Sequence, residues 1–164
     1  MRKALVAVTT TVSAAAMISG AGLAAASARP AATTTEHFQG MTTSGTSNKS
    51  SVIATGLFTV GGIDTRTSGS TDVFKFPKGT FKINHRPVHA KQAVNPKTCL
   101  LTISQSGTYK LGGGTGSYVG ISGHGKYAIS ILAVLARNSK GNCSMTATPV
   151  AFQQLITAQG PAKL

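Results

Sequence analysis

The stretch "TDVFKFPKGTFKINHRPVH", residues 71–89, decides the fold class. Apolar and polar residues alternate on both sides of "PKG", and proline and glycine in this arrangement form a turn between two strands. In the second half Phe81, Ile83 and His85 share one face, whereas Lys82 points the other way. The stretch therefore predicts a β-hairpin with one apolar face and one basic face.

The same period of two recurs along the chain, and no segment shows a helical stripe over three turns. Strands are predicted in 51–62, twice within 71–89, twice within 98–111 around a "QSG" turn, in 126–137 and in 143–158. Both faces of 126–137 are apolar, which predicts a strand buried on both sides. We expect an all-β fold, a single antiparallel β-barrel of about eight strands, because closure removes exposed sheet edges.

The N-terminus has the pattern of a secretory signal peptide. Arg2 and Lys3 precede a long run of small apolar residues, and Ala26-Ser27-Ala28 supplies a signal-peptidase site. We therefore expect a secreted, extracellular protein. The expected parts are a signal peptide over 1–28, a flexible Thr/Ser-rich leader over 29–50 and a barrel domain over 51–164.

Cys99 and Cys143 are the two cysteines of the chain. In an exported protein such a pair is expected to form a disulfide, and the spacing fits neither a CxxC redox motif nor a zinc site. The bond would close a long loop and stabilise the fold by about 3–4 kcal/mol.

Positive charge dominates the composition. Residues 29–164 hold 14 Lys and Arg residues against three acidic residues, a formal charge of +11. Such a charge favours anionic envelope polymers, although a solvated basic face is the simpler interpretation. No specific nucleic-acid partner is expected, because the aromatic residues do not interleave with the basic ones on one face. The predicted anion-binding residues lie in one acid-free stretch: Lys75, Lys78, Lys82, Arg86, Lys91 and Lys97.

The glycine-rich segment 112–125 contains a partial match to a phosphate-binding loop. Gly120, Gly125 and Lys126 fit, but Tyr127 stands where Ser or Thr would bind Mg²⁺. The residues that follow alternate as a strand, whereas a phosphate loop is followed by a helix. We therefore exclude a nucleotide site and interpret the glycines as turn and close-packing positions.

The same segment, "GGGTGSYVGISGHG", resembles the Gly-Gly-Thr-Gly-x-aromatic-x-Gly-x-x-Gly signature of the allene oxide cyclase and dirigent barrels. The matching residues are Gly113, Gly114, Thr115, Gly116, Tyr118, Gly120 and Gly123. The resemblance implies an eight-stranded antiparallel barrel with an apolar lumen, as a monomer or homotrimer. The functional polar residues of those families match no positions here. The whole chain also resembles small exported β proteins of actinobacteria, most of which have no assigned function.

No catalytic residue is predicted. Of the three carboxylates, Glu36 falls in the expected leader, and Asp64 and Asp72 flank a "TRTSGS" loop, which favours turn hydrogen bonds. The G-x-S-x-G motif of serine hydrolases does not occur in the sequence.

Three histidines are the other titratable candidates. An extended strand can place His85 and His89 on one side, with His124 joining them from the glycine segment, but lumen-lining or surface positions are the simpler interpretation. No metal site and no cofactor are predicted.

The expected function is non-catalytic binding of a small apolar ligand in the barrel lumen. Two alternatives stay open: an isomerase or cyclase of the allene oxide cyclase type, and a binder of anionic cell-envelope polymers through a basic face. The predicted ligand-binding residues are Phe58, Phe81, Ile83, His85, Tyr118 and Tyr127.

Overall fold

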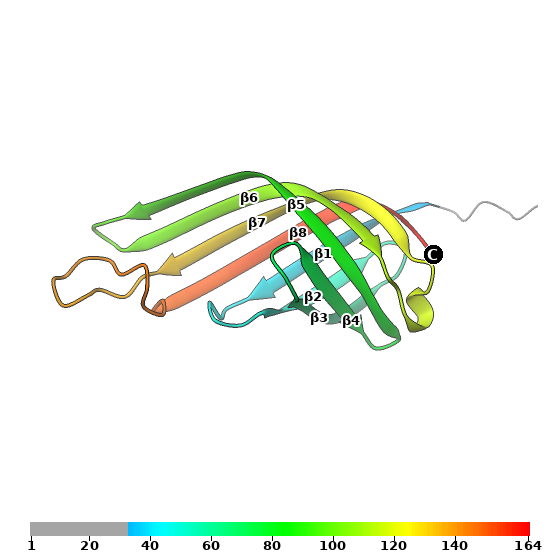
Figure 1. Cartoon of the computed structure of the whole chain (residues 1–164), viewed down its shortest axis with the longest axis horizontal. Coiled ribbons are helices and arrows are strands. Elements are labelled where there is room, and N and C mark those ends of the chain that lie inside the picture. The colour runs from blue at the N-terminus through cyan, green and yellow to red at the C-terminus, as the bar shows by residue number, and fades with distance from the viewer. Residues whose placement is uncertain (1–32) are drawn as a thin grey trace, which may run out of the picture. The chain divides into compact units, whose positions relative to one another are not determined.

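A computed structural model describes residues 33–164, which form a closed barrel of eight antiparallel strands (Figure 1). Each strand pairs with the next one in sequence, and β8 pairs with β1 to close the sheet. The predicted single antiparallel barrel is therefore confirmed. Its elements are β1 (Thr34–Thr42), β2 (Lys49–Thr55), β3 (Val60–Arg66), β4 (Thr71–Phe76), β5 (Gly79–Asn95), β6 (Leu100–Gly112), the 3-10 helix η1 (Gly116–Tyr118), β7 (Ser122–Val134) and β8 (Ala151–Lys163).

The barrel begins earlier in the chain than the sequence indicated. Strand β1 lies within the expected leader, and β2 begins at Lys49, so the domain boundary at residue 51 is wrong. β1 holds few large apolar residues, yet it alternates like the other strands, with Glu36 and Phe38 fully buried inside the barrel. The expected signal peptide, 1–28, lies outside the described residues.

Three strand expectations are corrected. The stretch 51–62 belongs to two strands, β2 and β3, joined by a turn. The outer face of β7 is exposed, with Leu132 at 44 %, so β7 is not buried on both sides. The expected "QSG" turn lies inside β6: a Cβ on Gly107 would lie 2.1 Å from the Arg86 carbonyl oxygen and 2.8 Å from the Tyr127 ring, so this glycine serves close packing within a strand.

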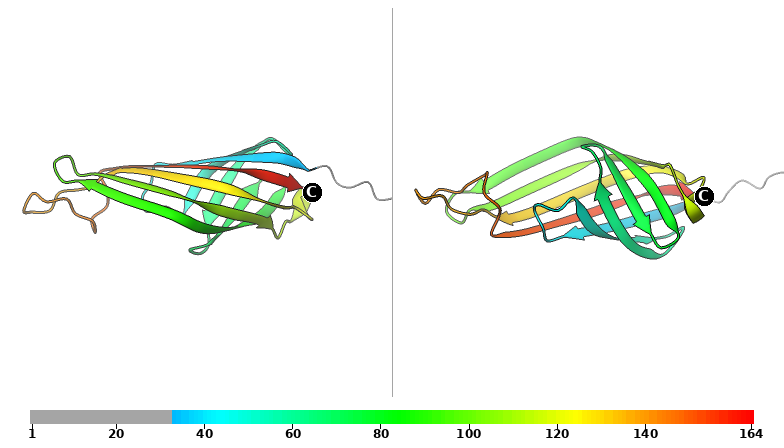
Figure 2. Two further views of the ribbon diagram at one scale, coloured as in Figure 1. Left: turned by 90° about the horizontal axis from the view of Figure 1, so that it is seen from above. Right: turned by 60° about the horizontal axis from the view of Figure 1, so that its bottom comes forward.

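The strands differ in length, which gives the barrel two different ends. β5 has 17 residues and β6, β7 and β8 have 13 each, whereas β1 to β4 have between six and nine. The long strands continue past the short ones as an open sheet (Figure 2). We call this part the sheet extension; it comprises 88–95 of β5, 100–106 of β6, 128–134 of β7 and 151–153 of β8.

Aromatic side chains fill the end of the barrel away from the extension. Phe81 is completely buried, and its ring centroid lies 6.0 Å from that of Phe58, 5.6 Å from Phe76 and 5.4 Å from Tyr118. The glycine-rich segment closes this end, because the Thr115 backbone N–H donates to the Thr80 carbonyl over 2.8 Å. This filled end leaves the opposite, open end as the place for a site.

A second apolar cluster holds the far end of the extension together. The predicted disulfide between Cys99 and Cys143 is confirmed, and it ties the segment after β7 to the turn between β5 and β6. Leu101, Ala133 and Leu135 are buried beside it. This cluster is separate from the barrel core, so the disulfide stabilises a region with few other buried contacts.

We expect the double variant Cys99→Ser/Cys143→Ser to lower the free energy of unfolding by about 4 kcal/mol, because the bond closes a loop with a sequence separation of 44. Urea denaturation followed by circular dichroism measures the loss. Met145→Ser, an exposed change in the same segment, is the control. A loss below about 1 kcal/mol, the size of an ordinary single substitution, would contradict the expectation.

Candidate functional site

All three side-chain carboxylates of the chain lie inside the barrel. Glu36 is 0 % and Asp64 is 6 % exposed, and the Asp72 side chain is 14 % exposed. The turn role expected for Asp64 and Asp72 is therefore wrong: they belong to β3 and β4, and neither carboxylate bonds to the loop between these strands. Burial of a carboxylate costs free energy unless partners compensate for it, so each group requires an explanation.

Glu36 serves the closed end of the barrel. Its Oε2 accepts the backbone N–H groups of Leu57 at 2.5 Å and Phe58 at 3.4 Å, which fixes the turn between β2 and β3. Burial raises the pKa of Glu36, and these two hydrogen bonds oppose the rise. The nearby Tyr109 hydroxyl has no hydrogen-bond partner among residues 33–164. Its pKa is raised to about 12, mainly by burial and secondly by the charge of Glu36. Glu36 is thus a structural group.

The other two carboxylates form a polar cluster at the open end. Asp72 lies opposite Arg66 in the β3–β4 pairing, and its Oδ1 is 3.8 Å from the Arg66 Nε. Its Oδ2 is 3.3 Å from the Nε2 of His85, which comes from β5. Asp64 lies two residues before Arg66 on the same face of β3. We call Asp64, Arg66, Asp72 and His85 the mouth cluster.

Aromatic rings hold the other side of His85. The Tyr127 ring meets the His85 ring edge-on, with centroids 5.6 Å apart, and it occupies the space left free by Gly107. The Tyr127 hydroxyl accepts a hydrogen bond from Gln105 Nε2 at 2.8 Å. His85 is thus fixed between a carboxylate and a tyrosine, an arrangement that orients an imidazole for hydrogen bonding.

The mouth cluster leaves several polar atoms without partners. Asp64 Oδ1, Asp72 Oδ1 and both His85 nitrogens are buried and make no hydrogen bond within residues 33–164. Asp72 and His85 are therefore in ion-pair range without the alignment of a hydrogen bond. Asp64, Asp72 and His85 line a cavity with a volume of about 40 Å³, enough for a water molecule or a small head group. It is otherwise lined by apolar and aromatic side chains, among them Phe38, Val52, Phe74, Ile83, Ile129 and Ile156.

Burial sets the protonation of the carboxylates. It raises the pKa of Asp64 to about 7, the neighbouring charge of Asp72 adds to the rise, and Arg66 opposes it. Burial also raises the pKa of Asp72, against the opposing charges of His85 and Arg66. Near neutral pH Asp64 therefore lies close to its protonation midpoint and can donate or accept a proton.

The six predicted ligand-binding residues divide between the two ends. Ile83, His85 and Tyr127 line the cavity of the mouth cluster. Phe58, Phe81 and Tyr118 belong to the packed closed end and do not line it. Local sequence patterns did not identify Asp64, Arg66 and Asp72 as site residues, although the alternation within 71–89 already places Asp72 on the face of Phe74 and Phe76.

The histidines do not share a face. The pairing of β5 with β6 shifts its register between Pro87 and His89, a β-bulge that sends His85 inward and His89 outward. His124 is exposed on β7. Within residues 33–164 no three metal-ligating side chains come together.

The six predicted anion-binding residues are exposed but do not form one patch. They extend from Lys78, in the β4–β5 turn, to Lys97, in the turn between β5 and β6. A denser group forms with two basic residues from outside that stretch: Lys110 and Lys126 lie on the outer wall near Lys82 and Arg86. Strand register brings these four together, and it is not visible in the local sequence.

Comparison of the chain with protein-family models, curated proteins and solved structures finds no match. The resemblance to allene oxide cyclase and dirigent barrels stays a prediction. Among the described residues no helix has the length and apolar character needed to cross a bilayer.

We expect the free energy of unfolding to fall as the pH rises from about 4 to about 7. Folded Asp64 keeps its proton up to a pKa of about 7, whereas the unfolded chain loses it near 3.8, so stability present below pH 3.8 is lost across this interval. In Asp64→Asn the fall in the free energy of unfolding over this pH interval should be smaller by up to about 4 kcal/mol. Urea denaturation between pH 4 and pH 8 measures it. An unchanged slope in Asp64→Asn would show that Asp64 is ionised in the folded protein.

Proposed function

We propose that this barrel binds a small amphipathic molecule at its open end, with the polar head of the ligand at the mouth cluster. One observation carries the proposal: Asp64, Asp72 and His85 line a single cavity, and four of their buried polar atoms have no hydrogen-bond partner within residues 33–164. In native proteins nearly all buried polar groups have a hydrogen-bond partner. Several buried groups without one, gathered around a cavity, therefore support a polar partner that is not part of residues 33–164. Hydroxyl and amine head groups suit carboxylate and imidazole acceptors.

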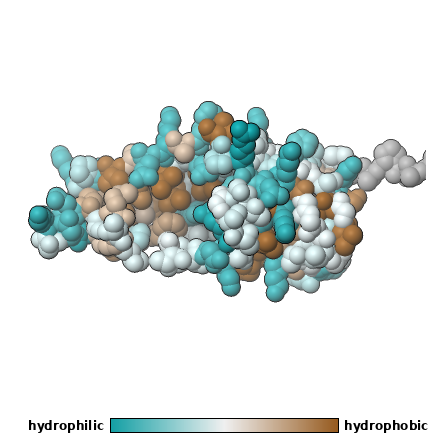
Figure 3. Space-filling model, in the orientation of Figure 1, coloured by the Kyte–Doolittle hydropathy of each residue, from teal (hydrophilic) through white to brown (hydrophobic). Residues whose placement is uncertain are grey.

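The apolar body of such a ligand needs a surface outside the cavity, because about 40 Å³ does not hold it. The inner face of the sheet extension offers one. Ile103, Ile131 and Phe152 are half-buried there. The face of the molecule drawn in Figure 3 carries an apolar area over the extension, beside the barrel mouth. The ligand would lie along the extension with its head in the mouth.

We also propose that the protein acts outside the cell. The Cys99–Cys143 disulfide supports this location, because such bonds persist in oxidising compartments. The N-terminal pattern described above points in the same direction.

A second candidate, an isomerase or cyclase, rests on the pairing of Asp72 with His85. An imidazole beside a carboxylate, with a protonated carboxyl close by, can donate and accept protons in a low-dielectric site. Turnover of a ligand identified by the binding experiment would distinguish this candidate from simple binding.

Native mass spectrometry of the protein purified from its own culture medium should show a non-covalent mass that is lost on denaturation. The variant experiment uses 1-dodecanol, a hydroxyl-headed probe, and Nile red, whose fluorescence reports an apolar surface. We expect 1-dodecanol to displace Nile red. Asp72→Asn and His85→Phe should weaken the binding of 1-dodecanol about tenfold, since the first replaces a charged acceptor by a neutral amide and the second removes the imidazole partner of the head group.

Thr71→Val is the matched control, because Thr71 neighbours Asp72 on β4 but bonds to Asn84 on the outer side. It should leave 1-dodecanol affinity unchanged. Equal affinities in wild type, Asp72→Asn and His85→Phe would refute the mouth cluster as the head-group site. Failure of wild-type protein to bind any probe, together with a clean apo mass, would refute the ligand-binding proposal itself.

A further inference from the structure

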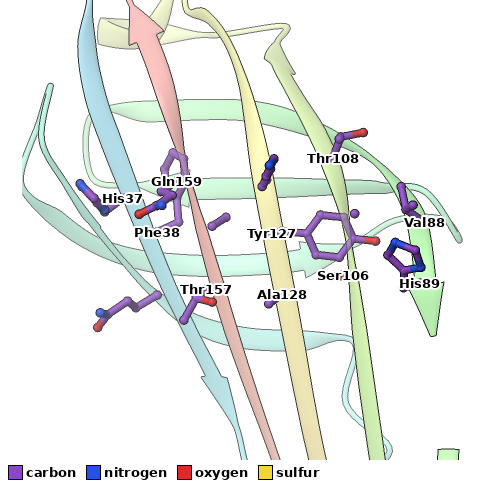
Figure 4. A pocket seen from close by; sticks show the side chains of 14 residues that line it. His37, Phe38, Val88, His89, Ser106, Thr108, Tyr127, Ala128, Thr157 and Gln159 are labelled. Atoms are coloured by element: carbon purple, nitrogen blue, oxygen red, sulfur yellow. The ribbon is translucent and has the colours of Figure 1, made fainter. Parts of the chain in front are cut away.

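The outer wall of the barrel carries a groove that is independent of the mouth cluster. It crosses β5, β6, β7, β8 and β1 on the face opposite the lumen and has a volume of about 710 Å³ (Figure 4). The strand register orders nine of its lining residues into two neighbouring rows, Thr108, Lys126, Gln159, His37 and His89, Ser106, Ala128, Thr157, Gln39. Arg86 pairs with Thr108 and extends the first row by one strand, at the edge of the groove.

The polar side chains of this groove are available to a ligand. In the described part of the chain, no side-chain hydrogen bond or ion pair joins any member of the two rows to another residue. Arg86, Thr108 and Lys126 are exposed, as are the amides of Gln39 and Gln159. Four strand-to-strand steps of about 4.8 Å give each row a length of roughly 19 Å. The groove thus presents a long series of free donors and acceptors.

Its electrostatic surroundings favour an anion. Every side-chain carboxylate of the chain faces the barrel interior, so no acidic side chain on the exterior of residues 33–164 opposes Lys126 and Arg86. Lys110 adds a third cation, because it lies opposite Asn84 and His124 in the next row. An anionic chain would meet attraction along the whole wall.

The mixture of groups in the groove favours one class of polymer. Hydroxyls and amides outnumber the lysine and arginine cations, and the two cations of the first row, Arg86 and Lys126, lie two strands apart. Such spacing fits a chain that carries separated charges among many hydroxyl groups. Densely charged polyphosphate would leave the amides and hydroxyls unused. Single-stranded nucleic acid is typically bound by stacking on exposed aromatic rings, whereas Phe38 and Tyr127 of this wall are buried.

We propose that this groove binds a carboxylated polysaccharide, with Lys126 in the groove and Arg86 at its edge pairing with uronate groups, and the flanking amides and hydroxyls pairing with sugar hydroxyls. The site is separate from the mouth cluster, because alternation along β7 sends Lys126 outward and Tyr127 inward.

The test measures binding of oligogalacturonate to the purified protein by isothermal titration calorimetry. Lys126→Gln should weaken binding about tenfold, the equivalent of one charge-assisted hydrogen bond. Lys140→Gln removes the same charge from the turn around 138–142, which lies outside the groove, and should leave affinity unchanged. Gln159→Ala and Thr108→Val should each weaken binding without any change in charge.

Three outcomes would overturn the proposal. Equal losses of affinity in Lys126→Gln and Lys140→Gln would show that binding depends only on the net charge of the protein. Tighter binding of polyphosphate at equal charge, insensitive to Gln159→Ala, would assign the wall to phosphate polymers. Absence of binding to oligogalacturonate would refute the groove as a polysaccharide-binding site. Asp72→Asn should not affect this titration, so failure here and failure of the mouth-cluster proposal are distinguishable.

Discussion

The pairing of β1 with β8 is the contact on which the rest of the structure depends, because it closes a sheet whose strands differ in length. The paired residues run from Thr34 opposite Ala162 to Thr42 opposite Gln154. The part of β8 before Gln154 has no partner on that side, and β5 loses β4 as a neighbour after Asn84. Closure thus creates the mouth, and the surplus length of the long strands creates the extension.

The extension has a free edge at β5, which would be a pairing hazard for an unprotected strand. Pro87, the neighbouring bulge and the charged Lys91 lie along this edge. Proline removes a donor, the bulge interrupts the ladder, and the lysine disfavours docking of another strand. The bulge also reverses the face on which the following residues lie. It therefore both protects the edge and places His85 and His89 on opposite faces of the sheet.

The alternation within 71–89 and the composition predicted the barrel, the disulfide and the inward face of β5 because these depend on local pattern and compartment. The failures have a common physical origin. β1 was missed because closure, a long-range contact, orders a polar strand that could not fold alone. The "QSG" turn expectation was wrong because Gly107 leaves room for the Tyr127 ring, which comes from another strand. The mouth cluster and the groove likewise join residues through register between strands, which one sequence does not reveal.

The acidic side chains and the lysines of the strands lie on opposite faces of the barrel sheet. The acids face inward, where burial raises their pKa and keeps Asp64 near its protonation midpoint at neutral pH, whereas the lysines of β4 to β7 face solvent. Each strand produces this division by alternating in and out, as Lys126, Tyr127 and Ala128 do in succession. Because a single sheet separates the faces, the proposed inner site would select a small partner by hydrogen bonds in a buried cavity, and the proposed outer site would select an extended partner by exposed charge. Interactions in the buried cavity are little screened by salt and those on the wall are strongly screened, so ionic strength acts on the two faces differently.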